Sequence, residues 1–181
     1  MIGTLFGKKR ISEEKLAHAF VHAVLALTEE GYPMIVDELQ DAPEFQDVPV
    51  FGPGDDELFA LLVFAGNLMD APKHLPAGQD RRFFSLAVSK FASAMGYIAS
   101  DLETEVIALQ HYMARVNHPS KLTVSAMSNA VFHKFDLFHC QNSFYRDQKA
   151  PNPIVLRRLQ RLMSFFLWDW AEIVEDYKVT A

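Results

Sequence analysis

Three residues that can bind a metal ion or move a proton are spaced three apart in one predicted helix: His133, Asp136 and His139. Imidazole and carboxylate groups are common ligands of divalent transition metals. The pattern is therefore compatible with a metal or proton-transfer site, with a divalent transition metal as its cofactor. Two alternatives stay open. His133 lies on the apolar arc of this helix, so it can be a core histidine bonded to a carbonyl or to Asp136. The group can also form a pH-sensitive interface.

A second pair of histidines, His18 and His22, lies four residues apart near the N-terminus. This spacing places both imidazoles on one helix face, as a metal site requires. That face also carries Lys15 and Glu29 and lies opposite Phe20, so it is the polar face. No glutamate follows the first histidine, as the zincin signature would require. We therefore expect two exposed histidines, with a metal site as the weaker alternative.

Other residue types suited to catalysis are not arranged for it. Glu103 and Glu105 are two residues apart and do not share a helix face. Cys140 is the single cysteine and has apolar neighbours on its arc, which is typical of an inert core thiol. One cysteine also excludes a disulfide framework and a multi-cysteine metal site. There is no P-loop, nucleophile elbow or dinucleotide-binding glycine motif. We therefore expect no enzymatic activity and no cofactor.

The elements that position these residues are predicted to be helices. Ser12, followed by two glutamates, starts a helix over 12–30, and Gly31 with a proline two positions later ends it. An acidic connector rich in proline and glycine follows over 32–54. The next helix, over 55–70, is apolar on all sides, so we expect it at the centre of the core.

Longer apolar patterns occupy the rest of the chain. One stripe over 80–117 stays in phase across Gly96 and predicts a single long helix, with a kink allowed at the glycine. Further helices are predicted over 121–148 and 153–176, and no segment shows the alternation of a strand. The sequence therefore predicts an all-α fold: one domain over residues 1–181, built as a bundle of five or six helices.

Four aromatic residues are candidates for an interface. The predicted helix over 121–148 carries two apolar arcs, so it is sandwiched inside the fold or between two subunits. One of these arcs includes Phe135, Phe138 and Tyr145. Trp168 lies at the edge of the apolar face of the last helix, where an exposed tryptophan would anchor an interface. Aromatic residues also line pockets for apolar small ligands, which gives an alternative function.

Charge is divided unevenly along the chain, whose net charge is −6. Residues 16–72 contain eleven acidic residues and no lysine or arginine. This segment suits a basic protein partner, the basic remainder of the same chain, or a solvated surface. A basic patch remains around Arg157, Arg158 and Arg161. Overall acidity argues against a nucleic-acid partner.

The sequence favours one function class over two alternatives. No apolar run reaches the roughly 18 residues of a membrane span, and the N-terminus has no secretory pattern. With a single cysteine, we expect a cytoplasmic protein without a membrane partner. We expect a non-enzymatic protein that acts through protein–protein contacts as a homodimer. The alternatives are a metalloprotein using His133 and His139, and a binder of an apolar small ligand.

Overall fold

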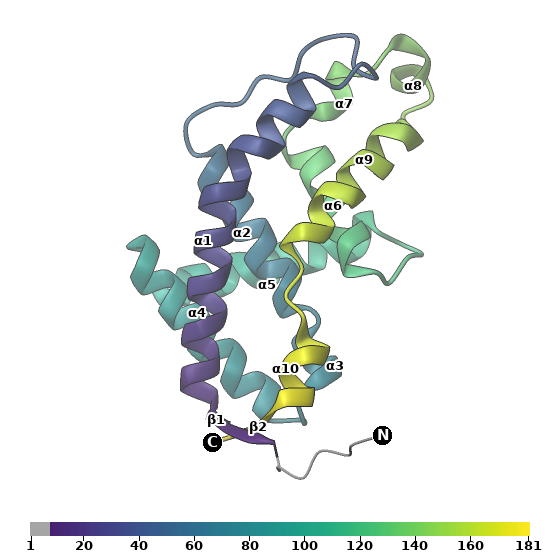
Figure 1. Cartoon of the computed structure of the whole chain (residues 1–181). Coiled ribbons are helices and arrows are strands. Elements are labelled where there is room, and N and C mark those ends of the chain that lie inside the picture. The colour runs from purple at the N-terminus through teal and green to yellow at the C-terminus, as the bar shows by residue number, and fades with distance from the viewer. Residues whose placement is uncertain (1–7) are drawn as a thin grey trace.

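The computed structural model describes residues 8–181, and its longest helix, α1 (Glu13–Gln40), runs along one side of the molecule (Figure 1). The helix begins where the sequence predicts, because the Ser12 hydroxyl accepts a hydrogen bond from the Lys15 N–H at 3.2 Å. The start of the chain, for which we expected no secretory signal, lies partly in residues 1–7 and so outside the described residues.

The predicted end of this helix at residue 30 is wrong. Pro33 lies inside α1 and removes one backbone hydrogen bond. The helix nevertheless continues, because Ile35 and Leu39 bury their side chains in the core beyond the proline. The acidic connector therefore covers residues 41–54 rather than 32–54.

Helix α2 (Asp55–Leu68) is the central helix, as predicted. Every residue from Phe59 to Leu68 is buried, because neighbouring helices cover the helix on several sides. Gly54 precedes it with a φ of 88°, a conformation that glycine adopts without strain. A single turn, α3 (Ala71–His74), follows.

The predicted single helix over 80–117 is instead two helices joined by a short turn. Helix α4 (Gln79–Met95) ends at Gly96, which has a φ of 76°, and α5 (Ala99–Val116) turns back against it. The backbone N–H of Tyr97 donates to the Ala92 carbonyl at 2.8 Å and closes the end of α4. The apolar stripe stays in phase because both helices turn it toward the same core.

The predicted helix over 121–148 is divided into three segments. Helix α6 (Thr123–Lys134) packs against α2, α5 and α9. It is followed by two short helices, α7 (Leu137–Cys140) and α8 (Ser143–Asp147). The break lies at Asp136, whose φ of 54° is incompatible with a continuous right-handed helix.

The C-terminal segment is also interrupted. Helix α9 (Pro153–Met163) continues into a 3₁₀ turn, η1 (Ser164–Phe166), and α10 (Trp170–Asp176) follows after an extended stretch. Buried Asn67 of α2 holds this stretch in place. Its amide donates to the Phe166 carbonyl at 2.8 Å and accepts from the Trp168 N–H at 2.7 Å.

Two short strands, which the sequence did not predict, join the two ends of the described chain. Strand β1 (Lys9–Ser12) pairs in parallel with β2 (Tyr177–Thr180), with Lys9 opposite Tyr177 and Ser12 opposite Thr180. They lie next to the start of α1 and below α10 (Figure 1). This small sheet fixes the last residues against the first helix.

The predicted fold class is confirmed: the chain forms a single compact all-α domain around one core. An aromatic cluster fills the centre, where Phe20 lies 5.7 Å from Phe64 and 5.6 Å from Phe83 between ring centroids. Within residues 8–181, no helix is both long and apolar enough to cross a membrane.

Candidate interaction surface

A mostly apolar hollow lies between α1 and the α9–η1 segment. We call it the α1/α9 groove, and its volume is about 480 Å³. Its apolar lining comes from both sides: Leu27, Gly31, Met34 and Ile35 on α1, and Leu162, Phe165 and Phe166 on α9 and η1. The groove therefore joins residues that are about 130 positions apart in the sequence.

The floor of the groove depends on a close approach between α1 and η1. The ring of Phe166 lies directly over Gly31, and a Cβ atom at this glycine would be 2.6 Å from the ring atom Cζ. Glycine therefore permits a contact that no other residue allows here. Asn67 holds the other side of the contact through the carbonyl of Phe166.

The rim of the groove exposes large apolar side chains. Phe165 is 71% exposed and Met34 is 66% exposed, while Leu27 is 40% exposed. Single exposed apolar residues are ordinary, but a cluster around one hollow makes this surface a candidate site for another molecule. Covering the rim would therefore remove more apolar surface from water than covering any other part of the groove.

Charged residues border the groove, and their signs differ between its two sides. Glu30 and Glu38 lie on α1, and Arg161 lies on α9. At one end Arg158 closes the groove by donating to Glu38 at 3.3 Å and to Glu44 of the connector at 3.0 Å. Burial opposes ionisation of Glu44, but its hydrogen bond from Arg158 leaves its pKa below the usual value.

Among the four predicted interface residues, Phe135 belongs to the core and Trp168 packs against it. Phe135 is buried and lies 5.7 Å from Phe51 between ring centroids. Trp168 is half-buried and stands edge-on to Phe20 at 5.4 Å, so it is not an exposed anchor. The sequence pattern places it beside the main apolar face of a continuous helix. The break after η1 turns it inward instead.

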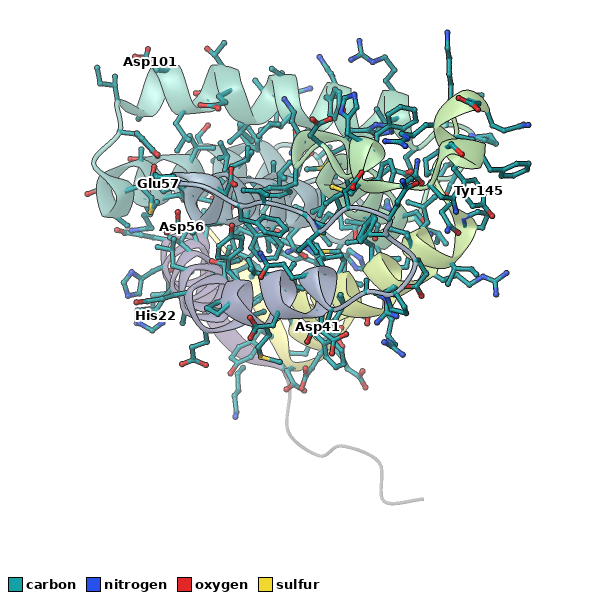
Figure 2. All side chains as sticks on the ribbon, turned by 90° about the horizontal axis from the view of Figure 1, so that it is seen from above. His22, Asp41, Asp56, Glu57, Asp101 and Tyr145 are labelled. Carbon is teal, nitrogen blue, oxygen red and sulfur yellow. The ribbon has the colours of Figure 1, made fainter. Side chains whose placement is uncertain are left out.

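The other two interface candidates lie at the far end of the molecule from β1 and β2. Phe138 of α7 is half-buried and packs against the core. Tyr145 of α8 is also half-buried, and Figure 2 shows it at the outer edge of the molecule. Neither lines the α1/α9 groove.

The His133, Asp136 and His139 group is only partly brought together. His139 Nδ1 lies 2.6 Å from Asp136 Oδ1, and the two side chains are 71% and 72% exposed. The prediction that His133 is buried is wrong, since the residue is solvent-exposed on α6. Partial desolvation by the surrounding protein nevertheless lowers the pKa of His133.

His18 and His22 are exposed, as expected, with ring centroids 6.4 Å apart. Figure 2 shows His22 on the outer side of the molecule, pointing away from its body. Across residues 8–181, no group of three or more His, Cys, Asp and Glu side chains is placed to hold a metal ion. Both predicted histidine sites thus remain without a third ligand in the described part of the chain.

Comparison of the chain with protein-family models, with curated proteins and with solved structures found no match. Its function must therefore be inferred from the surface itself. The sequence pattern alone does not reveal the groove, because it predicts a first helix that ends at residue 30. A signal was present: Leu27, Met34 and Glu38 fall on one face of a helix that continues through Gly31.

Proposed function

We propose that this chain is a cytoplasmic, non-enzymatic protein that acts through protein–protein contact as a homodimer, with the α1/α9 groove as its interface. The observation that carries the proposal is the cluster of exposed apolar side chains around the groove, with Phe165 71% and Met34 66% exposed. Covering one such side chain contributes about 1.5–3 kcal/mol. The cytoplasmic location is supported by the single cysteine, which is usual in reducing compartments.

A second copy suits the groove because each copy offers both an apolar side chain that protrudes and a hollow that can receive it. Phe165 stands at the rim, and the hollow beside it is lined by Ile35 of α1 and Leu162 of α9. Self-complementary features of this kind are what a two-fold interface requires. A small ligand bound in the hollow would leave the exposed rim residues in water. A protein surface would cover the rim as well as the hollow.

An apolar small ligand is the alternative that one observation favours. A hollow of about 480 Å³ lies in the range of ligand sites, and most of its lining is apolar. Native mass spectrometry of the purified chain distinguishes the two functions. A dimer without a bound molecule supports the proposal, whereas a monomer with a bound apolar molecule assigns the groove to a ligand.

The central test replaces Phe165 with aspartate and measures the oligomeric state by sedimentation over a series of protein concentrations. We expect the wild type to dimerise and Phe165→Asp to be monomeric at the same concentrations, because an unpaired charge would be buried in the interface. Circular dichroism confirms that the variant is folded, which its exposed position predicts.

Phe144→Asp is the matched control. Phe144 lies on α8 and is 61% exposed, but it does not line the groove. We expect this variant to dimerise like the wild type. A monomeric wild type would overturn the proposal. Loss of the dimer in Phe144→Asp, with Phe165→Asp unaffected, would instead move the interface to α7 and α8.

A further inference from the structure

The two sides of the α1/α9 groove run antiparallel, and two contacts fix their register. Glu38 of α1 meets Arg158 of α9 at 3.3 Å near one end. Near the other end, Phe166 of η1 covers Gly31. Arg161 lies one helical turn after Arg158, so it falls between these contacts and opposite the middle of the α1 side.

The charges of the two sides are opposite. The part of α1 that lines the groove contributes two glutamates, Glu30 and Glu38, and no lysine or arginine. Helix α9 carries three arginines and no acidic residue. The groove therefore separates an acidic side from a basic side.

Among the charged residues that line the groove, one acid and one base remain unpaired. Glu38 and Arg158 already form an ion pair. Glu30 and Arg161 border the same groove, and neither has an ion-pair partner within residues 8–181. Two unpaired charges of opposite sign at the rim of an apolar surface are available to a partner that presents the complementary arrangement.

Two orientations of a two-fold axis bring the grooves of two copies face to face with their long directions aligned. An axis across the groove places α1 against α1 and α9 against α9, so that like charges meet. An axis along the groove places α1 of each copy on α9 of the other, so that opposite charges meet. The charges therefore select the axis along the groove.

We propose that two copies associate about a two-fold axis that runs along the α1/α9 groove, with Glu30 of each copy paired to the partner's Arg161. This inference rests on the proposed homodimer and adds its symmetry and its specificity. With an axis along the groove, each residue has the same position along the groove in both copies. The partner's Arg161 then lies opposite Ile35, about 7.5 Å along the helix from Glu30, which is within reach of an arginine side chain. Each dimer contains this pair twice.

The test uses two charge reversals, Glu30→Lys and Arg161→Glu, separately and mixed. Each variant alone places two like-charged pairs in its own dimer, and we expect its self-association to weaken by about tenfold or more. In a mixed dimer, the introduced lysine of one chain faces the introduced glutamate of the other, and the second pair keeps its native residues. We therefore expect a heterodimer about as stable as the wild-type dimer. Glu103→Lys, an exposed charge reversal on α5, is the control and should not change self-association.

Sedimentation of the single variants and of their equimolar mixture gives three distinguishable results. Recovery in the mixture alone supports the inference. A wild-type dimer with no recovery in the mixture would overturn the axis and the pairing while leaving the groove as the interface. A monomeric wild type would overturn the homodimer and this inference together.

Discussion

At the scale of single residues, Asn67 has the greatest structural consequence. It is a buried polar residue in the most apolar helix, and its side chain binds the Val63 carbonyl and two backbone groups of the C-terminal segment. The backbone carbonyl of Asn67 accepts a hydrogen bond from the Trp170 indole N–H at 3.0 Å. Because these bonds replace water around buried backbone groups, Asn67 fixes η1 and so the floor of the α1/α9 groove.

We expect Asn67→Leu to lower the free energy of unfolding by about 2–3 kcal/mol, since the Phe166 carbonyl and the Trp168 N–H lose their partner. Urea denaturation measures the effect. Asn129→Ala is the control, because the amide of Asn129 bonds only to nearby groups of α6 and to Asn117. If both variants lost the same stability, the special role of Asn67 would be refuted.

At the scale of elements, the contact between α1 and η1 gives the next prediction. Alanine is the better helix former, so Gly31→Ala should stabilise an isolated helix by about 1 kcal/mol. In the folded protein we expect the opposite sign, a loss of about 1–3 kcal/mol, because the new Cβ collides with the ring of Phe166. Thermal or urea unfolding decides between the two signs.

Gly52→Ala provides the comparison for that substitution. No atom lies within 4 Å of a Cβ at Gly52, and its φ is not positive. We expect this variant to be neutral or slightly stabilising, because alanine restricts the unfolded chain. A Gly31→Ala protein as stable as the wild type would mean that η1 moves away from α1 without loss.

Glycines at helix ends show what the sequence could and could not predict. The start of α1 at Ser12 and the start of α2 after Gly54 follow from local residue types, and both predictions are confirmed. Gly31 has the local pattern of a helix end although it lies inside α1, because a tertiary contact decides its role. Gly96 has the pattern of a tolerated kink although it ends α4. A stripe that stays in phase cannot distinguish one long helix from two helices that face the same core.

The candidate site was less predictable than the fold for the same reason. The groove joins α1 to α9 and η1, and periodicity along one helix gives no information about which distant segment lies beside it. Trp168 and Phe135 are recognisable from the sequence as large aromatic residues, but their burial depends on helix breaks after Phe166 and at Asp136. Residue type therefore predicts their importance for packing and not their exposure.

At the scale of the whole molecule, acidic and basic residues lie on different elements, and these elements meet at the groove. The segment without lysine or arginine supplies α2, most of α1 and the acidic side of the groove. Arginines of α9 meet this segment where Arg158 binds Glu38 and Glu44. Part of the acidic segment thus binds the chain's own basic half. What remains unpaired at the groove is the basis for the proposed dimer.

The ion pair between Glu13 and Arg82 connects the beginning of α1 to α4, and it makes stability depend on pH. The Glu13 side chain is almost fully buried, and the Arg82 guanidinium donates to it at 2.7 Å and 2.9 Å. These hydrogen bonds, with a smaller contribution from Gln79, hold the pKa of Glu13 below its ordinary value although burial opposes this. Ionised Glu13 therefore favours the folded state.

A carboxyl whose pKa is lower in the folded state contributes its stability above the unfolded pKa of about 4.3, and that contribution disappears as the pH falls through the folded value. We expect the urea midpoint of the wild type to fall more between neutral pH and pH ~3 than that of Glu13→Gln, which has no proton to take up. Glu14→Gln, an exposed neighbour on the same turn, should follow the wild type. Glu44 contributes in the same direction in all three proteins, so only the difference between the curves reports on Glu13. Parallel curves for the wild type and Glu13→Gln would show that this pair does not link the two helices.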